Sequence, residues 1–233
     1  MSTPAAKPAP LVLAIDTAAG LSLALARGSD ILRRRATAVP QTTDVALLPT
    51  IQAWVHGAGV PDRIAVGTGP GSFTGTRVGI VAAKTLAWAW SVSLVGISSL
   101  EADAAAAGDP GAVVVATTEL LRDELYGGVY RCRGAGAAAG VEVLVPAEPR
   151  RLSWVPAGWP AGARLVVTGP LAAVPAFMAA LPGAEAHPDV FRACGLARLA
   201  PTAAPIDPMA LEPQYLRPAT RAGERGPGHG HLE

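Results

Sequence analysis

Cysteine and lysine are scarce in this sequence. Cys132 and Cys194 are the only cysteines among 233 residues, too few for a disulfide framework and not spaced as a C-x-x-C pair. Because Lys7 and Lys84 are the only lysines, the basic charge is nearly all arginine, and the formal net charge is +1. The sequence therefore lacks the strong basic footprint of a dedicated nucleic-acid-binding protein. We expect two reduced thiols in a cytoplasmic protein.

The sequence also has no segment with the pattern of a signal peptide or a membrane span. The first ten residues lack an apolar core, and Asp16 interrupts the apolar run that follows them. The long uncharged stretch at residues 165–184 contains three prolines and two glycines, which disfavour a spanning helix. We expect no membrane contact, a disordered lead-in at residues 1–10 and a disordered tail at residues 218–233.

Several motifs that carry chemistry are absent. No G-x-x-x-x-G-K-[ST] phosphate loop occurs, and the glycine segment at residues 69–75 is one residue off the dinucleotide fingerprint. Ser72 does not stand in a G-x-S-x-G nucleophile elbow. The four histidines include no i, i+4 pair suited to a catalytic metal. The motifs therefore indicate no metal site and no cofactor.

The stretch at residues 67–79 is the most informative one, because it joins an apolar strand to a long apolar helix. Gly67, Gly69, Gly71 and Gly75 permit close backbone approach, and Ser72 can cap the helix. A glycine loop that opens a helix is typical of anion binding. A tight strand-to-helix turn that serves only packing explains the same pattern, and it is the favoured interpretation of the loop alone.

The helix at residues 72–90 is apolar on more than one side. Helical spacing places Val78, Val81, Thr85 and Ala89 near one stripe, and Ile80, Lys84 and Trp88 near another. One sheet cannot cover both stripes. Such a helix is sandwiched between layers or presents one side to a partner.

The order of expected elements occurs twice along the chain. Strands are expected at residues 11–15, 21–25, 31–36, 63–67 and 93–97, with helices at residues 43–56, 72–90 and from residue 99. Pro49 is expected to kink or divide the helix at 43–56. After turn residues at 108–111, strands are expected at residues 112–116, 125–130, 141–145 and 164–170, with helices at 171–181 and 191–200. This repeated order predicts an α/β fold of two facing subdomains, residues 11–108 and a smaller one at 109–217.

Five segments together resemble the bacterial TsaB (YeaZ) family. They are VLAIDT at 12–17, LLP at 47–49, GPGSFTGTRVG at 69–79, RDELY at 122–126 and PQYLR at 213–217. The resemblance extends over nearly the whole chain from Leu11 to Arg217. It implies a duplicated actin, hexokinase and Hsp70-like (ASKHA) fold with a reduced second subdomain.

The same resemblance implies a function. Members of that family are non-catalytic partners of the transferase subunit TsaD in making threonylcarbamoyladenosine beside the tRNA anticodon, and the ATPase TsaE joins them. The resemblance therefore implies a heterodimer with TsaD, contact with tRNA only through the complex, and a homodimer where the partner is absent.

Site residues follow from the resemblance as well, because the glycine loop, its helix and the neighbouring helix match the family's dimerisation element. The residues expected at the partner surface are Leu47, Leu48, Ile51, Trp54, Gly69, Pro70, Gly71, Ser72, Phe73, Thr74, Gly75, Arg77, Val78, Val81, Lys84 and Trp88. Asp16 and Thr17 resemble the first phosphate loop of actin-like ATPases. Because no glycine-rich second phosphate loop follows residues 112–116, we expect them to be vestigial for nucleotide binding.

The sequence departs from the family in two places. Residues 41–44 (QTTD) stand where many relatives carry His-Ser-Glu, and residues 119–122 (ELLR) stand where relatives carry Asp-Ala-Arg-Arg.

Two other functions stay open. One alternative function is a small ATP-binding kinase or ATPase that uses Asp16 and the loop at residues 67–79. The other is direct tRNA binding by Arg33, Arg34 and Arg35 with Arg131 and Arg133, as a supporting contact.

Overall fold

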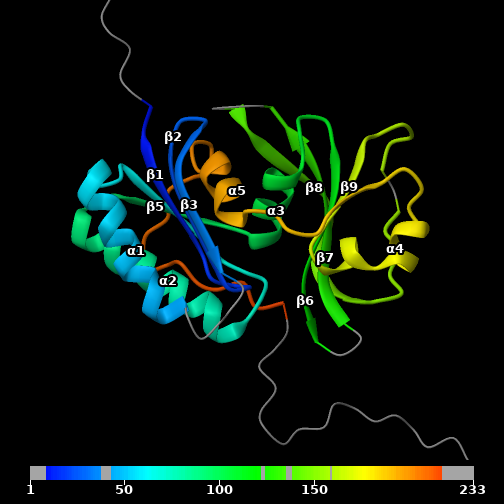
Figure 1. The fold of residues 1–233 in the computed structure, drawn as a ribbon, viewed down its shortest axis with the longest axis horizontal. Helices are drawn as coiled ribbons and strands as arrows, with labels where there is room; N and C mark the ends of the chain where they lie inside the picture. The colour runs from blue at the N-terminus through cyan, green and yellow to red at the C-terminus, as the bar shows by residue number, and fades with distance from the viewer. Residues whose placement is uncertain (1–8, 38–42, 122–123, 135–137, 158, 217–233) are drawn as a thin grey trace, which may run out of the picture.

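The computed structural model describes residues 9–37, 43–121, 124–134, 138–157 and 159–216. Most of the expected lead-in and all of the expected tail, as well as residues 41–42 and 122, lie outside these ranges. Figure 1 shows two β-sheets side by side, with helices between them and on both outer faces.

The two sheets have the same topology. The first contains β1 (Leu11–Asp16), β2 (Leu21–Arg27), β3 (Asp30–Thr37), β4 (Arg63–Gly67) and β5 (Ser93–Ile97), in the order β3-β2-β1-β4-β5. The second contains β6 (Val113–Leu121), β7 (Glu124–Arg133), β8 (Gly140–Arg151), β9 (Leu165–Thr168) and β10 (Glu185–His187), in the order β10-β9-β6-β7-β8. In each sheet the first strand pairs antiparallel with the second and parallel with the fourth. The predicted duplicated α/β fold is confirmed.

The first sheet is covered on both faces. Leu11, Leu13 and Ile15 of β1 belong to the core that faces α1 (Thr43–Ala58) and α2 (Phe73–Trp90). The intervening residues Val12 and Ala14 belong to the core that faces α5 (Arg192–Leu199). Because successive side chains of a strand point to opposite faces, a continuous apolar run is what a doubly covered strand requires.

Helix α3 (Ser99–Ala107) lies between the two sheets. Its Leu100 and Ala104 pack with Val114 of the second sheet, whereas Ala102 belongs to the core of the first sheet. A Cβ on Gly195 of α5 would collide with the backbone carbonyl of Ala102. Small residues on both helices therefore let α3 and α5 share the narrow space between the sheets.

Three details differ from the sequence expectation. Helix α1 runs undivided through Pro49, which is exposed, so water can reach the backbone carbonyl that the proline leaves without a donor. The repeated order of elements implies a helix between β8 and β9, but residues 152–157 and 159–164 contain none. The helix expected at residues 171–181 is instead a 3-10 turn, η3 (Pro170–Ala173), followed by the short α4 (Pro175–Ala179). Pro175 separates the two, since it has no N–H to continue the first turn.

The expected boundary at residues 108 and 109 falls in the connection between α3 and β6. Helix α5, which belongs to the second part of the sequence, nevertheless packs its Ala193, Leu196 and Ala197 into the core of the first sheet. The C-terminal part of the chain thus returns to the first half of the molecule. The division into residues 11–108 and 109–217 remains a prediction.

Candidate functional site

The glycine loop between β4 and α2 packs tightly against the turn that follows β1. A Cβ on Gly71 would lie 2.5 Å from the carbonyl oxygen of Ala18, and a Cβ on Gly75 would collide with the carbonyl oxygen of Thr17. The backbone N–H of Ser72 donates to the Ala18 carbonyl over 2.7 Å, and the Thr17 hydroxyl donates to the Gly75 carbonyl over 2.6 Å. The glycines thus serve close packing, because any larger residue would push the turn away.

The geometry gives Gly75 a packing role inside its own chain. The family resemblance places Gly75 at the partner surface, which stays a prediction, and the structure shows that a side chain added there would face the β1–β2 turn. A substitution at Gly75 therefore tests packing first.

We predict that Gly75→Ala lowers the free energy of unfolding by about 1–3 kcal/mol, because the backbone of Thr17 cannot rotate out of the way. Gly57→Ala in α1 is the matched control, since a Cβ there meets nothing nearer than 3.8 Å. It should leave stability unchanged or raise it by up to about 1 kcal/mol. Urea titration followed by circular dichroism measures both; equal midpoints for Gly75→Ala and the wild type would contradict the packing argument.

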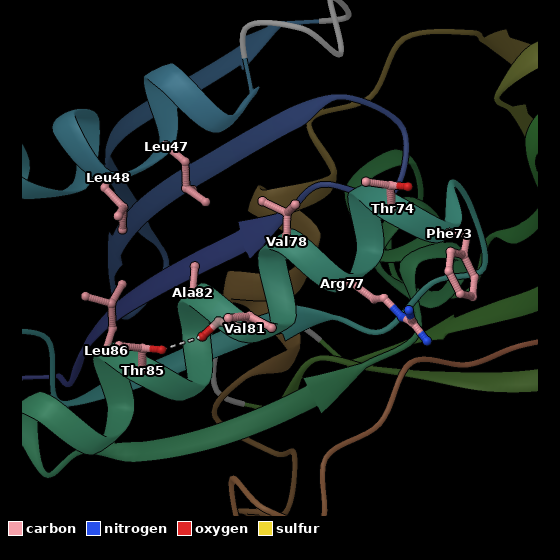
Figure 2. A pocket seen from close by; sticks show the side chains of 10 residues that line it. All are labelled: Leu47, Leu48, Phe73, Thr74, Arg77, Val78, Val81, Ala82, Thr85 and Leu86. Carbon is pink, nitrogen blue, oxygen red and sulfur yellow. Dashed lines mark hydrogen bonds between the residues drawn. The ribbon is translucent and has the colours of Figure 1, made fainter.

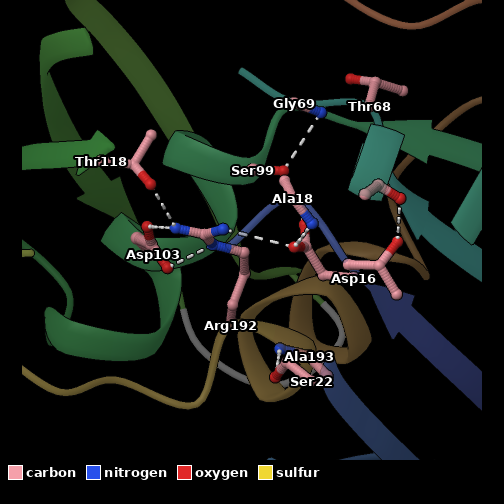
Figure 3. A network of polar contacts seen from close by, with 12 residues as sticks. Asp16, Ala18, Ser22, Thr68, Gly69, Ser99, Asp103, Thr118, Arg192 and Ala193 are labelled. Atoms are coloured by element: carbon pink, nitrogen blue, oxygen red, sulfur yellow. Dashed lines mark hydrogen bonds and ion pairs between the residues drawn. The ribbon is translucent and has the colours of Figure 1, made fainter. Parts of the chain in front are cut away.

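Asp16, at the end of β1, is buried and fully engaged within the chain (Figure 3). One carboxylate oxygen accepts the hydroxyl of Ser99 over 2.6 Å. The other accepts the backbone N–H of Ala18 over 2.9 Å and lies 3.3 Å from the guanidinium of Arg192. The Ser99 hydroxyl also accepts the N–H of Gly69 over 3.1 Å, so the same network reaches the glycine loop.

Arg192 lies at the centre of a buried ion triad. Its guanidinium donates to both oxygens of Asp103, over 2.8 and 2.5 Å, to Asp16, and over 3.2 Å to the hydroxyl of Thr118 in the second sheet. Burial raises the pKa of Asp103, although Arg192 opposes that rise. Burial also disfavours the charged guanidinium, but Asp103 and Asp16 outweigh it and raise the pKa of Arg192. The triad joins both halves of the molecule, because Arg192 also contacts Thr118 of the second sheet.

We predict that Arg192→Met lowers the free energy of unfolding by about 3–5 kcal/mol, because it leaves two buried carboxylates without their counter-ion. Arg164→Met is the matched control: Arg164 also contacts two carboxylates, Asp109 and Glu185, at 2.6 and 2.7 Å, but it is exposed. Its loss should not measurably move the unfolding midpoint, because water screens exposed pairs. Similar losses in the two variants, measured by chemical denaturation, would show that burial is not the deciding factor.

An apolar groove of about 660 Å³ lies on the opposite side of the first sheet, between α1 and α2 (Figure 2). Its lining residues are Leu47, Leu48, Phe73, Thr74, Arg77, Val78, Val81, Ala82, Thr85 and Leu86. Leu48 is 53% exposed and Val81 62% exposed. Arg77 is the one ionisable side chain in this lining. Large exposed aliphatic side chains that adjoin one another are typical of a surface that another molecule covers.

The structure divides the expected partner surface into exposed and buried members. The exposed members are Leu48, Phe73, Thr74, Arg77, Val81 and Trp88. The partly exposed members are Trp54, Gly71, Ser72, Gly75, Val78 and Lys84. Leu47, Ile51, Gly69 and Pro70 are buried, so they support the surface from below. The stripe of Ile80, Lys84 and Trp88 is split, because Ile80 faces the core while Trp88 is 80% exposed.

Sequence reasoning did not place Ala82, Thr85 and Leu86 in the candidate site, although all three line the groove. Helical spacing could have found them, since Ala82 and Thr85 follow Val78 and Val81 by four residues. The contact of Tyr215 with Phe73 was also missed: the two rings stack with centroids 5.1 Å apart. No spacing rule joins residues so distant in sequence.

The arginines considered for tRNA binding come from two different sheets. Arg33, Arg34 and Arg35 belong to β3, the edge strand of the first sheet, whereas Arg131 and Arg133 belong to β7 of the second. Arg131 and Arg133 both pair with Glu142, at 3.1 and 2.8 Å.

The described residues contain neither a candidate metal site nor a candidate membrane span. No group of three or more His, Cys, Asp or Glu side chains could hold a metal ion in these ranges. Within the same ranges no helix has the length and apolar character needed to cross a membrane.

Comparison with known proteins shows the family to which this chain belongs. The model of the TsaD family, described as tRNA N6-adenosine threonylcarbamoyltransferase, matches residues 41–180. The chain belongs to this family. A TsaD-family match over so much of the chain agrees with the ASKHA-type fold expected from the sequence.

Individual relatives confirm the resemblance to TsaB and YeaZ proteins. The TsaB protein of Bacillus subtilis, named for tRNA threonylcarbamoyladenosine biosynthesis, is 30% identical over 125 residues, 52% of this chain and 55% of the relative. The chain thus spans about half the length of the curated relative it matches. YeaZ from Pseudomonas aeruginosa superimposes with a TM-score of 0.68 at 24% identity, covering 89% of this chain and all of that one. A second Pseudomonas aeruginosa structure, described as similar to peptidase YeaZ, gives 0.69 with the same identity and coverage. At this identity the two structures show the shared fold.

Proposed function

We propose that this protein is a non-catalytic subunit in the threonylcarbamoyladenosine modification of tRNA, and that it binds and supports a TsaD-type transferase. The observation that carries the proposal is the apolar groove of α1 and α2, on the outer side of a fold that belongs to the transferase family. The proposal extends to a heterodimer through this groove, to TsaE as a further component, and to tRNA contact through the complex.

The exposed side chains of α1 and α2 favour the proposal of a macromolecular partner. Leu48, Val81 and Phe73 remain about half exposed or more, and the wide opening exposes aliphatic side chains of two helices at once. Covering these side chains removes apolar surface from water, which is the main driving force of protein association. Without the partner, the same face can pair with a second copy of the chain.

We predict that Val81→Glu weakens binding to the TsaD-type protein of the same organism more than about tenfold, because a charge would be buried at the centre of the contact. Val143→Glu is the matched control, since Val143 is 48% exposed but lies in β8 of the second sheet. Light scattering coupled to size-exclusion chromatography measures complex formation, and circular dichroism checks the fold. Undiminished binding by Val81→Glu would refute docking through the groove.

The alternative, an ATP-binding kinase or ATPase, finds less support at Asp16. That carboxylate is buried and already accepts three groups of its own chain. The cleft of about 470 Å³ beside it is lined by the three carboxylates of Asp16, Asp103 and Asp189 against the single cation Arg192. A net negative lining repels a phosphate chain, so a nucleotide would need Mg²⁺ and a rearranged triad.

We predict that calorimetric titration of the isolated protein with ATP and Mg²⁺ gives no binding heat. The physical reason is the internal use of the Asp16 carboxylate. Saturable binding that disappears in an Asp16→Asn variant of intact fold would favour the enzyme alternative instead.

A further inference from the structure

The last described segment of the chain, residues 206–216, crosses the end of the first sheet and reaches α2. The N–H of Ile206 donates to the Leu94 carbonyl over 2.9 Å, and the N–H of Gln214 donates to the Thr68 carbonyl over 2.7 Å. Leu211 is 3% exposed and belongs to the same core as α1 and α2. Figure 1 shows the segment in orange and red beneath the first sheet. We call residues 206–216 the C-terminal strap.

The strap holds Arg77 in place at one end of the groove. Arg77 Nε donates to the hydroxyl of Tyr215 over 2.7 Å. Its guanidinium lies 3.9 Å from the ring centroid of Phe73 and 5.7 Å from that of Tyr215, and the two rings stack on each other. Figure 2 shows Arg77 and Phe73 at the end of the groove away from Leu48 and Leu86. Two aromatic contacts and one hydrogen bond therefore fix a side chain that would otherwise be mobile on a surface.

The charge of Arg77 has no counter-ion in the described part of the chain. Its other guanidinium N–H groups make no hydrogen bond there, and no carboxylate of these residues lies within ion-pair distance. Covering the groove would take this charge out of water. Removing an unpaired charge from water is costly, so the covering molecule must supply an acceptor.

We propose that Arg77 is a specificity-determining contact of the partner surface, and that it binds a carboxylate side chain of the TsaD-type partner. This inference rests on the proposed function. Arginine suits the role, because its planar fork binds both oxygens of a carboxylate. The strap is the positioning element, because the hydroxyl of Tyr215 holds the guanidinium of Arg77 in place before the partner binds.

Two other occupants of the groove fit less well. A nucleic acid would need several cations along its backbone, whereas Arg77 is the one ionisable residue in the groove lining. A second copy of the chain would bring an identical lining, which contains no carboxylate to pair with Arg77. A different protein that carries an acidic side chain at the edge of an apolar patch satisfies both requirements.

The test measures the dissociation constant for the TsaD-type protein of the same organism by calorimetry at two salt concentrations. Arg77→Met keeps the apolar stem but removes the charge, and should weaken binding about 10- to 100-fold and reduce the salt dependence. Tyr215→Phe keeps the ring stack but removes the acceptor of Nε, and should weaken binding about 3- to 10-fold. Arg77→Lys should not restore wild-type affinity. Arg151→Met, at an exposed arginine of β8, is the charge control and should bind as the wild type does.

The outcomes separate the inference from the function on which it rests. If Val81→Glu abolishes binding while Arg77→Met binds with unchanged affinity and salt dependence, docking stands and the carboxylate contact is wrong. If the wild type does not bind the partner, the inference fails with the proposed function. An Arg77→Met effect confined to homodimer formation, or to affinity for an anticodon stem-loop RNA, would also overturn it. Restoration of Arg77→Glu binding by an acidic-to-arginine change in the partner would identify the carboxylate.

Discussion

The close approach between the turn after β1 and the loop that opens α2 determines how α2 lies on the first sheet. Gly71 and Gly75 leave no room between loop and turn, so the start of α2 is fixed against Thr17 and Ala18. With the start of the helix fixed, Ile80 faces the core and Val81 faces outward. The apolar groove between α1 and α2 is therefore a consequence of backbone packing, and the same packing fills the place where a helix N-terminus could have received an anion.

A second constraint acts on the other side of the same turn. Asp16 shares Arg192 with Asp103, and Arg192 also reaches Thr118 in the second sheet. The guanidinium of Arg192 thus lies beside Asp16, the residue that resembles the first phosphate loop of actin-like ATPases. A buried triad of this kind adds little net stability, but removal of one member lowers the free energy of unfolding strongly. The triad therefore acts as a geometric constraint between the two halves.

Much of the fold could be predicted from the sequence, because β-branched runs and turn residues repeat in the same order in both halves. The site was harder, for identifiable physical reasons. The resemblance to the family names the helices of the surface but not the depth of each side chain, so Leu47 and Ile51, which were expected at the surface, are buried, although Leu47 still lines the groove. Arg192 finds its carboxylates 89 and 176 positions away, and Arg77 finds Tyr215 across 138 positions. No local periodicity encodes such contacts; they exist only once both sheets and the strap are assembled.

The duplication provides an internal comparison that bears on function. In the second half, β9 also ends in a Gly-Pro turn, and a Cβ on Gly169 would collide with the carbonyl of Thr117, much as Gly75 would with that of Thr17. The helical segment that follows is short, however, and it buries Leu171 and Phe177 in its own core. The packed turn alone is therefore sufficient for this fold, and it does not require a long helix with an apolar outer face. The exposed face of α2 has no counterpart in the short helical segment after β9, and burial against another protein is the arrangement that would recover the free energy of its unburied side chains.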